Sequence, residues 1–337
     1  LAVTLGGHVA VDAQGTSPCN DEVRTAISSD GVTYTAGKLL RPYASAPDIL
    51  RMSNGSYAIY FVNFDGGLTQ QRVGVLTSTD GATWAFYEVN ILGMASQIDG
   101  GDPKVVQLSD GRFRMYVLYR GSTGIIKSAV SNAVDGRTFT LESGSRYVHT
   151  TQTADPEVVL VSSGYLMYLA TTPAGTILPA MSTDGGTTFT AFGTPFDIGG
   201  GVPGPYLFPT GTLRVYINAG PGQISSYTMA ADYYTATLEG VAFNSGDTAI
   251  VANPSVTQMT NGSYMMVYKY QSSAAAAAAC QPPQVTLLPT PPPLGTSPTT
   301  FAPLSPRFSS ANGLSAGVVI MVASTLLAAS LLLVAGI

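Results

Sequence analysis

Acidic and amide side chains flank a proline that recurs five times along the chain. The position before this proline holds Ala46, Asp102, Asp155, Val202 and Asn253, and the position after it holds Asp48, Lys104, Glu157, Gly204 and Ser255. Alternate residues of a strand share a face, so Asp155 and Glu157 are expected to point the same way. Carboxylates near one axis repel each other and raise at least one pKa, which suits general acid/base hydrolysis of a glycoside. The candidate catalytic residues are Asp48, Asp102, Asp155 and Glu157.

These prolines open a repeated unit, and each is followed eight residues later by a glycine. The copies run over residues 47–60, 103–116, 156–168, 203–216 and 254–268, each ending in tyrosine. Each copy has a Val/Ile-rich run, a turn such as Ser-Asn-Gly, and an aromatic run, which is typical of a tight β-hairpin. A period of roughly 50 residues is typical of propeller blades.

A second motif, Ser-x-Asp-Gly before an aromatic residue, follows most copies. It occurs at 78–84 and 182–189, with a looser form at 134–139 and a degenerate one at 232–234. An unpaired copy at 28–34 precedes the first hairpin, whereas the fifth hairpin lacks one. Strands near 23–27 and 33–36 should therefore complete the blade that begins at Asn253. The predicted fold is an all-β, five-bladed β-propeller closed by pairing of N- and C-terminal strands, plus a C-terminal hydrophobic helix.

The Asp-Pro pairs at 102–103 and 155–156 resemble those of five-bladed furanosidase-type glycosidases, including family 43 glycoside hydrolases. This resemblance implies Asp48 or Asp102 as base and Asp155 as the aspartate that tunes the acid. The family's Glu-Gly-Pro motif falls at residues 202–205, where the acidic Glu is absent, and Glu157 is the nearby replacement. We expect Lys104, Asn253 and Arg41 to bind substrate.

Two other functions stay open. In the first, Asp102 and Asp155 cap turns and the propeller is a non-catalytic recognition or adhesion module. In the second, the Ser-x-Asp-Gly motifs resemble the Asp-boxes of sialidases, which need three arginines around a substrate carboxylate. Arg41, Arg120 and Arg146 are the candidates for these, but five repeats disagree with the six blades of that family.

The charge of the chain excludes several other classes. The net charge is −5 with 15 basic residues, so nucleic acid is not expected as a partner. His8 and His149 are too few for a zinc site, and no glycine-rich phosphate loop opens a helix. No cofactor is expected; Ca²⁺ in the channel is a weak alternative, since no loop has the usual ligand spacing.

The composition divides the chain into four parts. Residues 1–18 are an N-terminal arm or the remnant of a signal peptide, and residues 19–272 form the propeller. Residues 273–313 read as an Ala/Pro/Ser/Thr-rich stalk, and 314–337 as a transmembrane helix or a GPI-attachment signal. We therefore expect a monomer on the extracellular face of the plasma membrane that binds a carbohydrate or glycoconjugate.

Two covalent modifications are expected in that setting. A Cys19–Cys280 disulfide would join the two ends of the propeller. Asn54 and Asn261 lie in Asn-Gly-Ser sequons for N-glycosylation, although both also fit simple turn chemistry.

Overall fold

The computed structural model describes residues 18–65, 67, 71–94, 100–119, 124–149, 153–171, 176–199 and 201–277. The chain divides into two compact units, 1–285 and 286–337, and every described residue belongs to the first. The predicted C-terminal helix, most of the predicted stalk, Arg120 and Cys280 lie outside the described residues. Among the described helices, none has the length and apolar character that a bilayer crossing needs.

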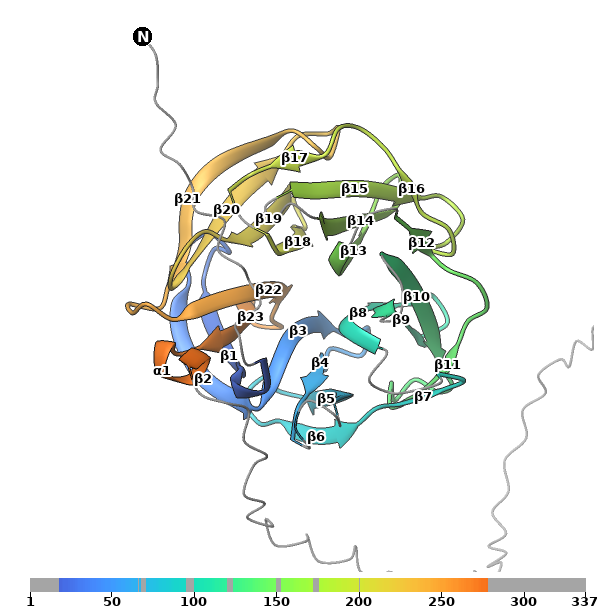
Figure 1. Cartoon of the computed structure of the whole chain (residues 1–337), viewed down its shortest axis with the longest axis horizontal. Helices are drawn as coiled ribbons and strands as arrows, with labels where there is room; N and C mark the ends of the chain where they lie inside the picture. Colours follow the sequence, from blue (N-terminus) through green and yellow to red (C-terminus); the bar gives the residue numbers. More distant parts are fainter. Residues whose placement is uncertain are drawn as a thin grey trace, which may run out of the picture. The chain divides into compact units, whose positions relative to one another are not determined.

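Five sheets are arranged in a ring around a central axis, and their strand pairs are antiparallel except for β7 with β11 (Figure 1). Blade one contains β3 (Ala44–Arg51), β4 (Tyr57–Asn63), β5 (Arg72–Ser78) and β6 (Ala85–Glu88). Blade two contains β8 (Gly100–Gln107), β9 (Phe113–Tyr119), β10 (Ile125–Ser131), β11 (Thr138–Leu141), β12 (Tyr147–Val148) and β7 (Asn90–Leu92). Blade three contains β13 (Thr153–Val161), β14 (Gly164–Thr171), β15 (Thr176–Ser182), β16 (Thr190–Ala191) and β17 (Phe196–Asp197). Blade four contains β18 (Pro203–Leu207), β19 (Leu213–Asn218), β20 (Gln223–Met229) and β21 (Ala236–Asn244).

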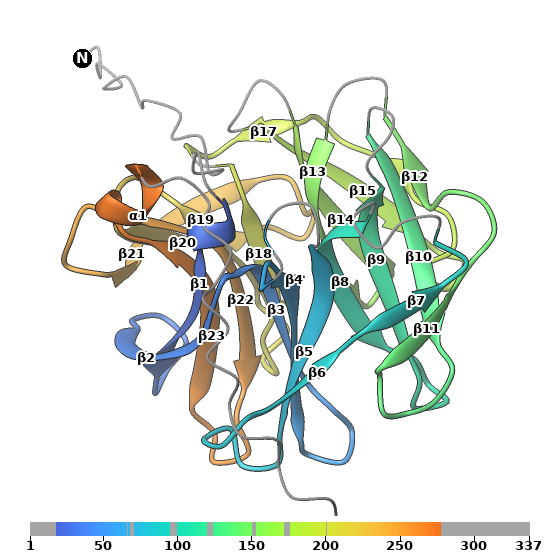
Figure 2. The ribbon, with the colours of Figure 1, turned by 60° about the horizontal axis from the view of Figure 1, so that its bottom comes forward.

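Both ends of the propeller sequence build the fifth sheet, which we call the closing blade. Its strands are β22 (Ile250–Gln258), β23 (Tyr264–Gln271), β1 (Glu22–Ser28) and β2 (Thr35–Pro42), in the order β22-β23-β1-β2. Strand β1 pairs antiparallel with β23 from Glu22↔Tyr270 to Ser28↔Tyr264. The innermost strands β3, β8, β13, β18 and β22 contact one another in a closed ring (Figure 2). The predicted five-bladed fold and its closure are confirmed.

Buried tyrosines link successive blades. The Tyr60, Tyr116, Tyr168 and Tyr216 hydroxyls each donate to a turn carbonyl of the next blade: Gly136 at 2.9 Å, Gly186 at 2.9 Å, Tyr233 at 2.6 Å and Gly31 at 2.5 Å. Val267 takes the equivalent place in the closing blade, opposite Ser255. At that last interface the methyl of Met259 packs beside Gly81 instead. Each tyrosine ends one of the sequence repeats, so the repeat encodes the contact between blades as well as the hairpin.

The Ser-x-Asp turns share one set of hydrogen bonds. Ser28 Oγ donates to Asp30 Oδ1 at 2.8 Å, and Asp30 Oδ1 accepts from the backbone amides of Val32 and Thr33. The turns at Asp80 and Asp184 repeat this pattern. The following aromatic rings Tyr34 and Phe189 pack edge-on against Tyr216 and Tyr116 of the preceding blade. These aspartates therefore hold turns and lie away from the channel residues.

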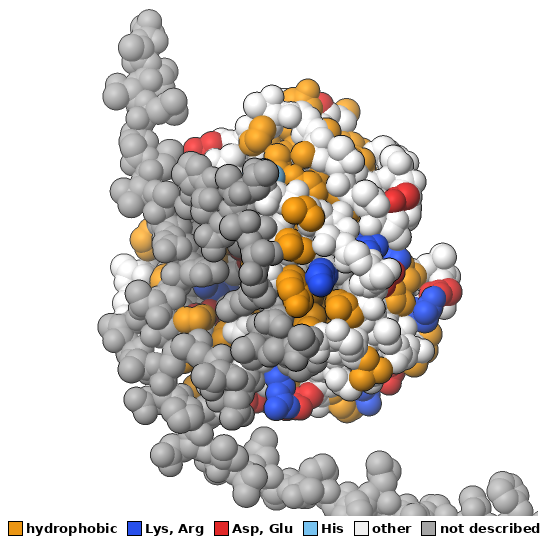
Figure 3. All heavy atoms as spheres, turned by 45° about the vertical axis from the view of Figure 1, so that its right-hand side comes forward, with side chains coloured by type: hydrophobic (Ala, Val, Ile, Leu, Met, Phe, Trp, Pro, Cys, Tyr) orange, Lys and Arg blue, Asp and Glu red, His pale blue; other side chains and the backbone are white. Residues whose placement is uncertain are grey.

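Charged side chains are scattered over the described surface. Figure 3 shows small groups of Lys, Arg, Asp and Glu side chains on one side of the molecule, with basic and acidic side chains next to each other in several places. This matches a chain in which charged residues make up only 10% of the sequence.

Candidate functional site

Four of the five inner strands carry a β-bulge at the repeated proline. Ala46, Asp102, Asp155 and Asn253, which precede this proline, have positive φ angles of 48°, 49°, 49° and 49°. The strand register shifts at each of these places. Asp and Asn tolerate this left-handed conformation better than other residues with side chains, whereas Ala46 adopts it under strain. The residue before proline is therefore a bulge position that aims its side chain differently from its neighbours.

A buried ion-pair network joins the residues that follow the proline. Lys104 Nζ donates to Asp48 Oδ1 and lies 3.1 Å from Glu157 Oε2. Asp48 Oδ1 also accepts from Ser255 Oγ at 2.8 Å, and its Oδ2 accepts from the Val105 amide at 2.7 Å. Both Asp48 oxygens are thus engaged, and its side chain is only 2% exposed. This network links the closing blade with blades one, two and three.

Lys104 is held between two carboxylates rather than presented to a ligand. Burial disfavours its charge, but the Asp48 and Glu157 carboxylates outweigh burial and raise the Lys104 pKa above its ordinary range. Burial raises the pKa of Glu157, Lys104 opposes that rise, and Asp48 adds to it. One ammonium cannot fully balance two carboxylates, so Glu157 binds a proton more readily than it would in water.

The side chains at the bulges form a second group. Asn253 Nδ2 donates to Asp155 Oδ1 at 2.6 Å. Burial raises the pKa of Asp155 to about 8, and the charge of Asp102 adds to this rise, while Asn253 and Lys269 oppose it. Asp102 is half-buried, and Asp155 and Asn253 are buried. Asp155, with its raised pKa, and the more exposed Asp102 are the two carboxyl groups of this second group.

Three polar residues near this group were not among the predicted site residues. Lys269 Nζ lies 3.5 Å from Asp21 Oδ2, which also accepts from Ser45 Oγ at 2.6 Å. Burial raises the pKa of Asp21 to about 6, against the opposing charge of Lys269. A lysine within the apolar strand Tyr264–Gln271 was the one sequence signal of this cluster.

Blade four contributes no carboxylate to the channel. A Cβ on Gly204 would lie 1.8 Å from the Pro254 carbonyl oxygen, because β18 and β22 approach closely. Strand β18 pairs with β19 in unbroken register, and its flanking Val202 is buried. The glutamate expected from the glycosidase resemblance is absent, because Val202 and Pro203 stand where the motif has its Glu and Gly204 takes the place of the motif's own glycine.

The predicted arginines do not meet in one place. Arg41 lies in β2, the outer strand of the closing blade, where it pairs with Asp65 and stacks on Phe86. Arg146 lies beside β12 of blade two and donates to the Ser143 carbonyl. Blade one separates these two blades, and Arg120 lies outside the described residues. Arg41 and Arg146 therefore lie on different blades, and each has a partner of its own within the described residues.

Across the described ranges, no three His, Cys, Asp or Glu residues are arranged to hold a metal ion. The channel aspartates are instead bonded to Asn253, Lys104 and Ser255.

The chain was compared with known proteins by sequence and by structure. No family model and no curated protein sequence matches the chain. Solved structures do match. An α-L-arabinofuranosidase of family 43 from Clostridium thermocellum has a TM-score of 0.51 at 16% identity, covering 67% of this chain and 81% of that one. An endo-arabinase from Bacteroides thetaiotaomicron has a TM-score of 0.52 at 17% identity, covering 66% and 88%.

An exo-β-1,3-galactanase from Phanerochaete chrysosporium has a TM-score of 0.53 at 13% identity, covering 76% of this chain and 66% of that one. The chain has the fold of the propeller glycosidases. The resemblance seen in the Asp-Pro pairs is therefore a resemblance in fold, and at these identities it extends no further. In this propeller Asp48 is ion-paired with Lys104, and blade four has no Glu at the Glu-Gly-Pro position.

Proposed function

We propose that the channel group Asp102, Asp155 and Asn253 binds a carbohydrate and that the protein is a carbohydrate-recognising propeller. The observation that carries the proposal is the Asn253–Asp155 hydrogen bond, which brings polar groups from separate blades to one point of the channel. Carboxyl and amide groups both donate to and accept from sugar hydroxyls. The similarity in fold to an arabinofuranosidase, an arabinase and a galactanase supports this class of ligand.

Recognition without hydrolysis fits the network best. Both oxygens of Asp48 are engaged, Glu157 is paired with Lys104, and blade four supplies no acid. A glycosidase needs two carboxyl groups that reach opposite sides of the scissile bond. Among the described channel residues, Asp102 and Asp155 lie outside the Asp48–Lys104–Glu157 network and are the candidates for these roles.

Hydrolysis is the second candidate, and the raised pKa of Asp155 favours it. In this mechanism Asp155 protonates the leaving oxygen, and the more exposed Asp102 activates water or attacks the sugar. Carboxyl groups about 5–5.5 Å apart would retain the anomeric configuration, whereas about 6.5–9.5 Å would invert it.

Glycan-array binding and chromogenic-glycoside turnover of the full chain test both candidates. N253A should weaken sugar binding at least about ten-fold, because it removes the amide and leaves Asp155 without its partner. D80N is the matched control, since Asp80 holds a surface turn in blade one. Binding that N253A leaves unchanged would contradict the channel site. Turnover that D155N and D102N both abolish would replace recognition by hydrolysis.

An extracellular, membrane-attached location is part of the same proposal. It rests on the sequence of residues 273–337, with a proline-rich stretch before an uncharged apolar end. Release from cells by a phosphatidylinositol-specific phospholipase would support a GPI anchor, and retention after that treatment would support a spanning helix.

A further inference from the structure

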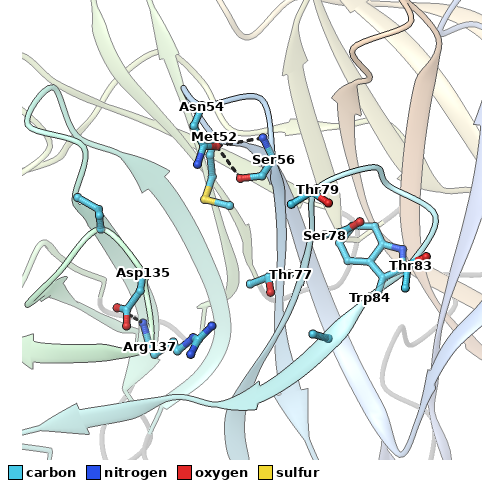
Figure 4. A pocket seen from close by; sticks show the side chains of 12 residues that line it. Met52, Asn54, Ser56, Thr77, Ser78, Thr79, Thr83, Trp84, Asp135 and Arg137 are labelled. Atoms are coloured by element: carbon cyan, nitrogen blue, oxygen red, sulfur yellow. Dashed lines mark hydrogen bonds between the residues drawn. The ribbon is translucent and has the colours of Figure 1, made fainter. Parts of the chain in front are cut away.

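A groove of about 450 Å³ lies between blades one and two (Figure 4). Its walls come from the β3–β4 turn, the β5–β6 turn and the β10–β11 turn. These turns follow the ends of β3, β5 and β10, whereas the bulges lie near the beginning of the inner strands. The groove is therefore a separate site from the channel group, and its volume is that of a small-ligand pocket.

One wall of the groove carries a glycosylation sequon. Asn54 lines the groove, is exposed, and accepts at Oδ1 from the Ser56 amide at 3.0 Å and the Ser56 hydroxyl at 2.5 Å. Both bonds end on the side-chain oxygen Oδ1. They do not involve Nδ2, which is the atom that carries an N-linked sugar. In Figure 4, Asn54 lies at the top and Trp84 at the right, with Ser56 and Thr79 between them.

The other wall suits a sugar. Trp84 is half-buried and offers an aromatic surface, with the Thr77 and Thr83 side chains in the same lining. Two buried donors of the lining, Trp84 Nε1 and Arg137 Nε, have no hydrogen-bond acceptor among the described residues. Both of these atoms are closed to solvent, so the part of this wall that is open to a sugar is the exposed surface of Trp84 and of the two threonines.

We propose that Asn54 carries an N-linked glycan whose first sugars fold back into this groove and pack against Trp84. The glycan is attached when Nδ2 of Asn54 displaces the diphosphate of a polyprenyl-linked oligosaccharide. The C1–N bond forms, the C1–O bond breaks, and Nδ2 loses one proton. This inference rests on the extracellular part of the proposed function and does not depend on sugar binding in the channel.

The second sequon provides a matched control. Asn261 accepts the same two bonds from Ser263, at 3.0 Å and 2.7 Å, in the equivalent turn of the closing blade. Asn261 is not part of the groove lining. A glycan on Asn261 would be attached by the same chemistry, but it would have no groove beside it to fold into.

Trp84 is the only tryptophan of the chain, so its fluorescence reports on the groove alone. The full chain would be produced in a eukaryotic secretory host, its glycosylated peptides identified by mass spectrometry, and Trp84 quenching by acrylamide measured. N54Q and S56A both remove the sequon, so each should raise the quenching constant roughly two-fold as the half-buried ring becomes accessible. N261Q should leave the constant unchanged. An unmodified Asn54 in the secreted protein, or equal quenching in all four proteins, would overturn the proposal.

Discussion

Asn253 donates a hydrogen bond to Asp155 across the channel at 2.6 Å, although 98 positions separate the two residues in sequence. They belong to the closing blade and blade three, between which blade four is inserted. The inner strand of blade four lies close to this pair, because a Cβ on Gly204 would come 1.8 Å from the carbonyl oxygen of Pro254, the residue after Asn253. Blade four adds no carboxyl group here, since Val202 and Pro203 stand where the glycosidase motif has its Glu.

The first prediction concerns the pH dependence of stability. The pKa of Asp155 is raised from 3.8 to about 8, so the folded protein holds a proton that the unfolded chain releases. This group's contribution is fully present below the unfolded pKa, falls as pH rises, and is lost above about 8. D155N cannot ionise and should flatten the decline of Tm between about pH 5 and pH 9. Differential scanning calorimetry across this pH range measures the Tm of the wild type and of D155N, with D80N as control. Parallel wild-type and D155N profiles would show that Asp155 is ionised in the folded state.

The fold could be predicted because its signals are local. The Pro-to-Gly spacing encodes each hairpin, and the unpaired motif at 28–34 predicted a closure that the β1–β23 pairing confirms. The sequence repeat also contains the tyrosines that link the blades, but the repeat alone does not indicate that they bond to the next blade. A tyrosine that ends an aromatic strand does not show in sequence which carbonyl it meets in the next blade.

The site was predictable only in part. Convergence of Asp102, Asp155 and Asn253 followed from their repeat positions. The bulges did not, because Ala46 shares the positive φ angle of Asp102 although alanine does not favour it. The position of Arg41 could not be predicted either, since the sequence does not show that β2 is an outer strand. Asp48 and Lys104 were assigned separate roles, and only the structure shows that each satisfies the other's charge.

The second prediction concerns this buried pair. K104M removes the ammonium between Asp48 and Glu157 and leaves two carboxyl groups without a counter-charge. Breaking a buried ion pair in this way should lower the unfolding free energy by about 3–5 kcal/mol. R72M is the control, because Arg72 and Glu88 are 47% and 59% exposed and such surface pairs contribute about 0–1 kcal/mol. Urea denaturation compares the unfolding free energies of these variants. Adding E157Q to K104M removes one of the two carboxyl groups, so the double variant should be more stable than K104M. Equal losses in K104M and R72M would contradict the structural role of the network.

The third prediction concerns the tyrosines between blades. Y116F removes the hydroxyl that donates to the Gly186 carbonyl, while the ring still packs against Phe189. The buried carbonyl then lacks its donor, so the variant should lose about 1–3 kcal/mol of unfolding free energy. Y60F should behave alike at the interface between blades one and two. Thermal or urea unfolding measures both. Y87F serves as control. The Arg137 guanidinium stacks on the face of the Tyr87 ring, and this contact does not involve the hydroxyl. If Y116F matched Y87F in stability, packing alone would hold the blades together.

The last prediction concerns the two ends of the propeller. Cys19 is buried in the short helix Pro18–Asn20 and is not a free thiol, while Cys280 lies outside the described residues. Asn20 Nδ2 donates to the Ala275 carbonyl oxygen at 3.1 Å, which places the helix Ser273–Ala277 beside Cys19. A Cys19–Cys280 disulfide would close a loop around the whole ring, and the chain-entropy model gives it an upper value of about 5 kcal/mol.

Peptide mapping without reductant should recover the cross-linked pair. C19S, C280S and the double variant should lose the same stability, since each breaks one bond, and reductant should destabilise only the wild type. Two thiols titrating per unfolded, unreduced chain would disprove the bridge.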